Sequence, residues 1–208
     1  MIISVLYVLQ LQGRFILIDM TKDQLRKLYR AQRNSLSIEE KQAYNSNLLE
    51  KLKSFEWEQY TYVHVYIPLE KFNEPDTIPF ISWIREYSPH IHLVTSQSDF
   101  KTGEMKHYLL EDTTQLVENH WGILEPLVGE AIAEEMLDVI LVPLLVVDSR
   151  GNRVGYGKGF YDRFMGKCRA DVLTIGISFY DVVPKITDVS EWDIPLKCCV
   201  TPNKVYYF

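Results

Sequence analysis

A short apolar run that leads directly into a glycine-rich, basic loop constrains this chain more than any other feature. Residues 139–147 are mostly Val and Leu, interrupted only by Pro143, which predicts a strand buried on both faces. A turn follows by composition, and then four glycines lie close together: Gly151, Gly155, Gly157 and Gly159. Arg153 and Lys158 lie among them, and residues 160–165 are typical of the first turns of a helix. The stretch predicts a strand, a loop and a helix in immediate succession.

This loop has the composition that a bound phosphate requires. Missing side chains let backbone N–H groups approach an anion, the start of a helix adds partial positive charge, and Arg and Lys neutralise oxygens. The spacing is neither that of a P-loop nor a clean Gly-x-Gly-x-x-Gly after a strand. On composition alone, phosphate binding and a tight turn with two solvated cations remain equally good interpretations.

The other segments predict one α/β domain. Thr21 and Ser37 are typical N-caps of two successive helices. Residues 60–66 and 89–95 read as strands, and residues 171–179 read as a buried strand that follows the helix after the glycines. Alternating helices and buried strands favour a single three-layer domain with a mainly parallel sheet flanked by helices.

Some segments carry weaker signals. We expect helix or loop over residues 113–120 and a turn over residues 122–126. His64 lies inside a predicted strand and is expected to be a satisfied core or edge residue. His90 and His92 alternate with apolar residues, but no Cys or carboxylate is spaced to complete a zinc site.

Lys22, Arg26, Arg30 and Arg33 fall on one face of the first predicted helix, because they are spaced by four, four and three residues. Such a basic stripe is usually a solvated face. Here it has a second interpretation, since cations on this helix could meet a nucleotide phosphate held by the glycine-rich loop.

Bulk composition limits the classes of function. The chain has 208 residues, which suits one domain, and its formal net charge of −6 argues against a nucleic-acid surface. No apolar stretch is long enough to span a bilayer, so we expect no membrane partner. The three cysteines, Cys168, Cys198 and Cys199, lack metal-type spacing, which favours reduced thiols in the cytoplasm. We expect a monomer.

The apolar segment 1–19 stands apart from the rest. It lacks the positive start and the small-residue cleavage site of a signal peptide. A second methionine, Met20, precedes the first predicted helix. We therefore divide the chain into an N-terminal extension of uncertain status, residues 1–19, and a domain, residues 20–208. An extra strand and an unstructured extension both remain open for the first segment.

The string from Leu141 to Arg163 closely resembles the signature of the 5-formyltetrahydrofolate cyclo-ligase family, also called 5,10-methenyltetrahydrofolate synthetases. Weaker matches follow the order of that family's motifs: residues 22–26, Glu74-Pro-Asp-Thr, Trp121 to Pro126, and Asp193-Ile-Pro-Leu. The resemblance runs from about Met20 to the end. It implies the same α/β architecture and closure of 5-formyltetrahydrofolate to 5,10-methenyltetrahydrofolate, with ATP converted to ADP and phosphate and with Mg2+ required.

The resemblance also implies roles for individual residues. Arg153 and Lys158 would carry the catalytic charge. ATP would contact Lys22, Asp23, Gln24, Leu25, Arg26, Arg153, Val154, Gly155, Tyr156, Gly157, Lys158, Gly159, Phe160 and Tyr161. The folate substrate would contact Leu69, Glu74, Tyr156, Gly157, Lys158, Gly159 and Phe160.

The resemblance assigns Mg2+ to the carboxylates of Asp162 and Asp193, as hard oxygen ligands. Each has a plainer interpretation. Asp162 could simply be an acid at a helix start, and Asp193 could be a turn acid before a proline. Glu74, judged from its own neighbours, could likewise be a solvated acid that precedes a helix.

The chain departs from the family pattern at a few positions. Phe160 stands where the family commonly has Tyr, Tyr156 stands where some members have Arg, and Lys197-Cys198 replaces an acidic residue. Arg153, Lys158 and the glycines are kept, so we expect a competent enzyme. Two rivals remain: a non-catalytic nucleotide- or folate-binding module, and an enzyme of similar architecture that acts on a sugar phosphate or a coenzyme A thioester.

Overall fold

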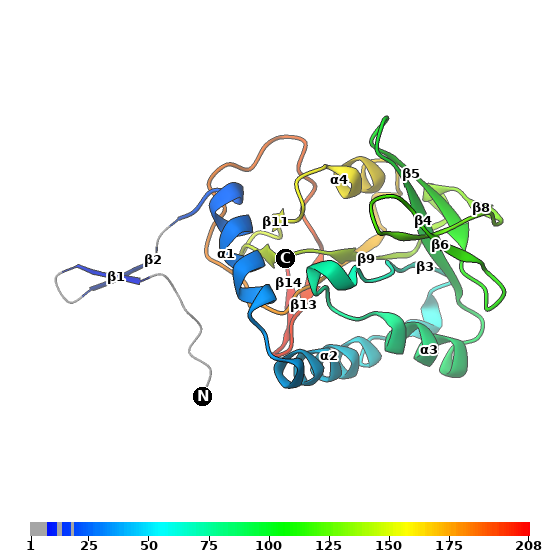
Figure 1. Ribbon diagram of the computed structural model, residues 1–208, viewed down its shortest axis with the longest axis horizontal. Coiled ribbons are helices and arrows are strands. Elements are labelled where there is room, and N and C mark those ends of the chain that lie inside the picture. The colour runs from blue at the N-terminus through cyan, green and yellow to red at the C-terminus, as the bar shows by residue number, and fades with distance from the viewer. Residues whose placement is uncertain (1–7, 12–13, 18) are drawn as a thin grey trace.

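A mainly parallel sheet forms the centre of the computed structural model, which describes residues 8–11, 14–17 and 19–208 (Figure 1). Across this sheet the strands follow the order β14 (Val205–Tyr207), β13 (Cys198–Val200), β12 (Leu173–Ile177), β9 (Val139–Pro143), β3 (Tyr62–His64), β4 (His92–Asp99), β5 (Glu104–Leu109) and β8 (Ala131–Ile132). Neighbours from β13 to β4 pair in parallel. Strand β14 at one edge, and β5 and β8 at the other, pair antiparallel. The predicted fold class is confirmed.

Helices cover both faces of the sheet. They are α1 (Lys22–Asn34), α2 (Ile38–Lys53), α3 (Ile78–Tyr87) and α4 (Phe160–Met165), with short 3-10 turns η1 (Trp57–Gln59), η2 (Glu70–Phe72) and η3 (Glu134–Met136). On one face, α2 and α3 bury Leu52 and Phe80, whereas α4 buries Phe164 on the other (Figure 1). Cys198 and Cys199 are adjacent in β13, and each enters a different one of these two core clusters, as the alternation of side chains in a strand requires.

Local sequence explains where the first two helices begin. Thr21 and Ser37 each accept a hydrogen bond from the backbone of the residue three positions later, and the side chains of Gln24 and Glu40 reach back to the caps. Both predicted N-caps are therefore confirmed as complete capping boxes, which satisfy N–H groups that a helix start otherwise leaves unpaired.

The predicted strand over residues 139–147 is divided in two. Strand β9 ends at Pro143, and the chain continues as β10 (Val146–Val147), which pairs antiparallel with β11 (Arg153–Val154) outside the central sheet. Proline has no N–H to donate to a neighbouring strand, so the sheet ladder stops there. Because β9 ends here, the glycine-rich loop lies outside the central sheet and follows the carboxyl end of β9.

The segment from residue 113 to residue 126 differs from expectation. It forms a hairpin of β6 (Leu116–Glu118) and β7 (Leu124–Pro126), so the expected helix or loop and the expected turn are both corrected. Glu125 fastens the hairpin to the sheet by accepting from the backbone N–H of Ser98 in β4 at 2.7 Å. Three-residue strands are too short to show a clear alternation of apolar and polar positions, which is why sequence alone missed them.

Near the N-terminus, β1 (Val8–Leu11) and β2 (Arg14–Leu17) pair with each other, separately from the central sheet. The rest of the segment 1–19, apart from Asp19, lies outside the described residues, and its status as an extension stays a prediction. Within the described ranges, no helix combines the length and the apolar character needed to cross a membrane.

A tight turn after β10 holds the C-terminal segment against the glycine-rich loop. Gly151 adopts a φ of +81°, and a Cβ at this position would lie 2.6 Å from the carbonyl oxygen of Leu196. At Gly155, by contrast, an added Cβ would meet nothing within 4 Å. Glycine is therefore required at position 151, in the turn between β10 and β11, and not at position 155, which follows β11.

We predict that Gly151→Ala lowers the free energy of unfolding by about 1–3 kcal/mol, because it adds both backbone strain and a steric clash. Chemical denaturation followed by circular dichroism would measure the change. Gly155→Ala is the matched control and should change stability by less than about 1 kcal/mol. Equal destabilisation by the two variants would contradict this account of the turn.

Candidate functional site

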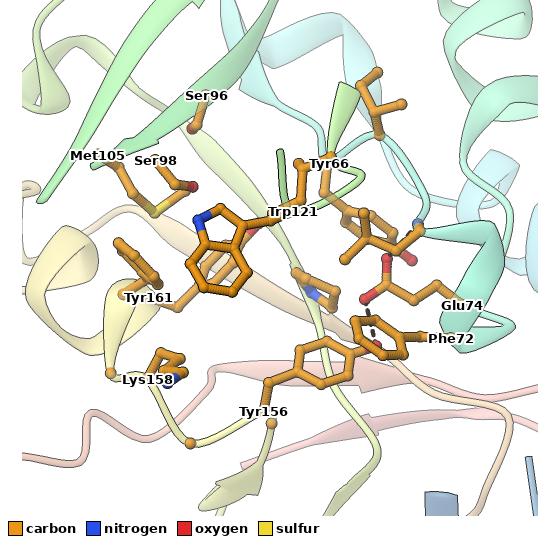
Figure 2. A pocket seen from close by; sticks show the side chains of 18 of the residues that line it. Tyr66, Phe72, Glu74, Ser96, Ser98, Met105, Trp121, Tyr156, Lys158 and Tyr161 are labelled. Atoms are coloured by element: carbon orange, nitrogen blue, oxygen red, sulfur yellow. Dashed lines mark hydrogen bonds between the residues drawn. The ribbon is translucent and has the colours of Figure 1, made fainter. Parts of the chain in front are cut away.

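A cavity of about 840 Å3 opens at the carboxyl ends of the parallel strands. Its wall includes Pro143 at the end of β9, Tyr66 just after β3, and Ser96 and Ser98 in β4 (Figure 2). In open α/β sheets this edge is the usual position of a ligand site, and the volume suits a small organic molecule. The cavity is therefore the candidate active site.

The glycine-rich loop forms one wall of the cavity. Every residue from Gly155 to Asp162 lines it, as does Arg153, whereas the side chain of Val154 is buried in a core cluster with Leu25. Gly157 and Gly159 adopt φ angles of +84° and +69°, a backbone region that favours glycine. The structure thus brings all but one of the loop residues predicted to contact ATP to a single surface.

Helix α1 supplies part of the same wall. Lys22, Arg26 and Arg30 line the cavity, and the Arg26 Nε atom donates to the carbonyl oxygen of Gly155 at 3.0 Å. The basic stripe is thus directed at the glycine-rich loop rather than only at solvent. Arg33 differs from the other members of the stripe, because it is buried at 2% exposure.

The three remaining α1 residues predicted to contact ATP point elsewhere. Asp23 forms an ion pair with Lys27 at 2.9 Å on the exposed face of the helix, Gln24 completes the capping box, and Leu25 is buried in the core. Their side chains do not line the cavity, so only their backbone atoms could contact ATP there. Among the predicted α1 contacts, the structure places Lys22 and Arg26 at the site.

The two predicted metal carboxylates lie on the cavity wall, each paired with a predicted phosphate-binding cation. Asp162 Oδ1 accepts from Arg153 Nη2 at 2.7 Å and from the backbone N–H of Ile194 at 3.1 Å. Asp193 Oδ2 accepts from Lys22 Nζ and from the backbone N–H of Ser190. Burial opposes ionisation of Asp193, but these two hydrogen bonds prevail and lower its pKa.

These carboxylates offer a limited donor set for a divalent cation. The second oxygen of each, Oδ2 of Asp162 and Oδ1 of Asp193, accepts no hydrogen bond from the described residues. No group of three or more His, Cys, Asp or Glu side chains suited to a metal occurs in the described ranges. The arrangement suits Mg2+, which binds one or two carboxylates together with phosphate oxygens, rather than an all-protein metal cage.

Arg153 and Lys158 occupy different environments. The Arg153 side chain is 8% exposed, and it donates to the Ile194 carbonyl oxygen at 2.6 Å as well as to Asp162. Lys158 is exposed at the cavity, and its ammonium group forms no ion pair within the described residues. Lys158 is therefore available to a ligand, as are Arg30 and Lys71, which also line the cavity, are exposed and form no ion pair within the described residues. Arg153 already holds two segments of the chain together.

Glu74 is buried at 3% exposure, so the interpretation as a solvated acid is wrong. Its Oε2 atom accepts from the backbone N–H of Leu69 at 2.7 Å, and its Oε1 atom accepts from the Tyr156 hydroxyl at 2.6 Å (Figure 2). Burial raises the pKa of Glu74 despite these hydrogen bonds. All three residues line the cavity, so the structure joins the predicted folate loop to the glycine-rich loop.

A buried polar chain lies beside this site. Ser96 Oγ is 2.7 Å from His64 Nε2 and 2.8 Å from His107 Nδ1, and both histidines are almost fully buried. Burial is the main reason that the pKa of His107 falls to about 4, and burial also lowers the pKa of His64. The prediction that His64 lies in the core is confirmed by its full burial, and its Nε2 atom is hydrogen-bonded to Ser96. Its Nδ1 atom has no hydrogen-bond partner among the described residues, so the prediction that the side chain is satisfied holds for only one of its two nitrogens.

Sequence reasoning gave no role to several residues that line the cavity. Trp121, in the β6–β7 hairpin, is 50% exposed and extends across the cavity opening, with its ring 5.2 Å from that of Phe100 (Figure 2). Phe72 and Met105 add apolar surface. The available signal for Trp121 was a large aromatic residue in an otherwise polar connection, which is a common feature of binding surfaces.

Comparison with known proteins gives a consistent result. A family model described as "5-formyltetrahydrofolate cyclo-ligase family" matches residues 18–202. The 5-formyltetrahydrofolate cyclo-ligase of Escherichia coli K12 is 33% identical over 141 residues, which cover 64% of this chain and 74% of that protein. The enzyme of the same name from Mycolicibacterium smegmatis is 28% identical over 153 residues, covering 68% and 74%.

Solved structures agree with the sequence relatives. The 5,10-methenyltetrahydrofolate synthetase of Aquifex aeolicus superposes with a TM-score of 0.74 at 28% identity, covering 90% of this chain and 93% of that chain. The synthetase of Mycoplasma pneumoniae superposes with a TM-score of 0.70 at 22% identity, covering 87% and 98%, and this second likeness concerns the fold alone.

We predict that stability falls as the pH drops from about 6.5 towards 4, because the unfolded chain binds a proton at His107 that the folded chain does not. The depressed pKa contributes stability above pH 6.5, and this contribution, up to about 3 kcal/mol, is lost towards pH 4. Denaturation midpoints measured across this range would test it. His107→Gln should show a weaker pH dependence than the unaltered chain, and identical profiles would contradict the assignment.

Proposed function

Because the chain belongs to the 5-formyltetrahydrofolate cyclo-ligase family, we propose that it closes 5-formyltetrahydrofolate to 5,10-methenyltetrahydrofolate with conversion of ATP to ADP and phosphate. One observation carries this proposal: a single cavity gathers the glycine-rich loop, the α1 cations and the buried Glu74, which lie far apart in the sequence. We also propose that the protein acts as a monomer in the cytoplasm.

The chemistry requires activation of a poor leaving group. The formyl oxygen of the substrate resembles an amide oxygen and leaves readily only after it has received a phosphoryl group from ATP. Nitrogen N10 then attacks the formyl carbon and loses its proton, and phosphate departs to leave the methenyl bridge. The protein's task in such a reaction is to position the reactants and to stabilise the charge of the transferring group.

The glycine-rich loop and α1 would serve the phosphate end of the cavity. Lys158 offers an exposed ammonium group, Gly157 and Gly159 present backbone without side chains, and Arg26 holds the loop against the helix. These features suit binding of phosphate oxygens by backbone N–H groups and a mobile cation. Arg153 would act mainly by fixing Asp162 and the segment at Ile194.

Asp162 and Asp193 would hold Mg2+ through their free oxygens together with ATP phosphates, and the ion would supply charge neutralisation of those phosphates. Both acids are already paired with cations, Arg153 and Lys22, in the protein itself. These ion pairs would hold the two carboxylates in place at the cavity wall.

The opposite part of the cavity would bind the folate ring system. Glu74 places a carboxylate at the wall, and each of its oxygens has a further lone pair for an N–H group of the substrate. Phe72 and Tyr156, whose rings lie 4.9 Å apart, provide aromatic surface beside Glu74, and Trp121 adds an aromatic ring to the lining, which suits a flat heterocycle. Leu69 fixes the Glu74 carboxylate through its backbone N–H.

The rivals make different predictions. A binding module would retain ATP and folate without releasing phosphate, and a sugar-phosphate or coenzyme A enzyme would not respond to ATP. The decisive experiment follows the absorbance of methenyltetrahydrofolate with purified protein, 5-formyltetrahydrofolate and Mg2+, with and without ATP. ATP-dependent growth of that band supports the proposal. Binding of ATP without growth favours the module, and no ATP binding would refute the assignment of the glycine-rich loop.

We predict that Lys158→Ala lowers kcat about 100-fold or more, because it removes an exposed, unpaired cation from the glycine-rich loop at the phosphate end. The same absorbance assay measures the loss. Lys27→Ala is a suitable control, since Lys27 is also exposed but lies on the outer face of α1 and does not line the cavity. Full turnover by the Lys158 variant would show that this lysine is only a solvated loop residue.

We predict that Asp162→Asn raises the Mg2+ concentration needed for half-maximal rate, since it replaces a charged ligand with a neutral one. Titration of Mg2+ at fixed ATP would show the shift. Asp171→Asn, an exposed acid outside the cavity, should leave the titration unchanged. An unaltered Mg2+ requirement in the Asp162 variant would remove this residue from the metal site.

A further inference from the structure

One buried cationic side chain beside the cavity, that of Arg33, has no role in the proposed reaction. Arg33, at the end of α1, is buried at 2% exposure. Its Nη1 atom donates to the carbonyl oxygen of Leu144 at 3.3 Å and its Nη2 atom donates to the Tyr156 hydroxyl at 2.6 Å. Both of these acceptors are uncharged, and a buried charge is unfavourable unless an opposite charge compensates for it. The arrangement therefore requires a nearby anion.

Glu74 supplies that anion through a tyrosine bridge. Tyr156 donates its hydroxyl proton to Glu74 Oε1 at 2.6 Å while it accepts from Arg33. An arginine can only donate, so the proton of the bridging hydroxyl must point at the carboxylate. The three groups form one directional chain, in which the charge of Arg33 strengthens the hydrogen bond that Tyr156 gives to Glu74.

Packing holds the bridging ring in place. The Tyr156 ring lies 4.9 Å from the ring of Phe72, at an interplanar angle of 32° (Figure 2). The Arg33 guanidinium carbon lies 5.8 Å from the centre of the Tyr156 ring. Phe72 belongs to η2, two residues before Glu74, so the ring is fixed by the same segment that carries the carboxylate. Tyr156 itself lies between Gly155 and Gly157 in the glycine-rich loop.

We propose that Arg33 is a positioning residue of this enzyme, which acts through Tyr156 to keep the Glu74 carboxylate ionised and fixed at the cavity wall as an acceptor for substrate N–H groups. The identity of the substrate rests on the proposed function, whereas the Arg33–Tyr156–Glu74 chain does not. Tyr156 belongs to the glycine-rich loop, which would bind ATP. The Arg33–Tyr156–Glu74 hydrogen bonds therefore make the orientation of the Glu74 carboxylate depend on the position of that loop.

The proposal predicts the direction in which the pKa of Glu74 changes when Tyr156 or Arg33 is altered. Burial raises the pKa of Glu74, while the hydrogen bonds from Tyr156 and from a backbone N–H and the charge of Arg33 lower it. Tyr66 and Tyr161 also face the carboxylate, and burial raises the pKa of both far enough to keep them neutral. Removing either the Tyr156 hydroxyl or the Arg33 charge should therefore raise the pKa of Glu74, so that acidification neutralises it at a higher pH.

The direct test needs no turnover. Protein labelled with 13C at glutamate carboxyl groups is titrated by NMR, and the spectrum of Glu74→Gln identifies the resonance. Tyr156→Phe, which keeps the ring, should move the Glu74 midpoint to higher pH. Tyr66→Phe is the matched control, because its hydroxyl donates to the Pro75 carbonyl oxygen instead, and it should move the midpoint less. Arg33→Met should shift the midpoint in the same direction as Tyr156→Phe.

A double variant separates action through Tyr156 from a general effect of charge. Arg33→Met should shift the Glu74 midpoint less in the Tyr156→Phe background than in the unaltered protein, because the bridge is already absent. An unchanged midpoint in Tyr156→Phe would overturn the proposal, whatever the activity. Tyr156→Phe keeps the test decisive if Arg33→Met fails to fold.

Kinetics then show whether the chain serves the reaction. Tyr156→Phe should raise KM for 5-formyltetrahydrofolate roughly tenfold and move the acid limb of kcat/KM to higher pH, after subtraction of the rate without enzyme. A merely structural role would lower the rate equally at every pH. A shifted NMR midpoint with an unchanged KM and acid limb would overturn the positioning role. Failure of the unaltered protein to form product would instead refute the proposed function and leave the NMR result standing.

Discussion

The parallel pairing of β9 with β3 on one side and with β12 on the other is the arrangement on which the rest of the site depends. Strands that run parallel release their following loops at the same edge of the sheet. The glycine-rich loop follows β9, the segment with Glu74 follows β3, and the segment with Asp193 follows β12. Residues that are more than a hundred positions apart in the sequence consequently line one cavity. Helix α1 contributes Lys22, Arg26 and Arg30 to the same lining.

Charges inside this cavity are largely paired within the protein. Asp162 binds Arg153, Asp193 binds Lys22, and Glu74 is linked to Arg33 through a tyrosine. Burial penalises a lone charge, and pairing offsets part of that cost where acids and bases share an apolar wall. Pairing also fixes the orientation of each group before a substrate binds, and such preorganised groups stabilise the charge that develops in a transition state. The cations that line the cavity and form no ion pair within the described residues are the exposed Lys158, Arg30 and Lys71.

Features that depend on neighbouring residues in the chain could be predicted well. The N-caps at Thr21 and Ser37 were predicted correctly, since a cap needs only a side chain and the backbone three residues later. Segment 116–126 was misjudged, because its strands are short and gain their stability from pairing with each other. The continuous strand expected over residues 139–147 was wrong for a related reason: Pro143 ends the ladder, and β10 finds its partner in β11.

By itself, the sequence was sufficient to indicate a buried strand, a glycine-rich loop and a helix in succession, within an α/β domain of a recognisable family. These conclusions rest on composition, spacing and local hydrogen bonding, all of which act over a few residues. The environment of each charge depended on the tertiary structure. Glu74 and Arg33 both looked like solvated groups, yet folding buries them and joins them through Tyr156. Burial and long-range pairing arise only when distant segments pack together, so no local pattern could have shown them.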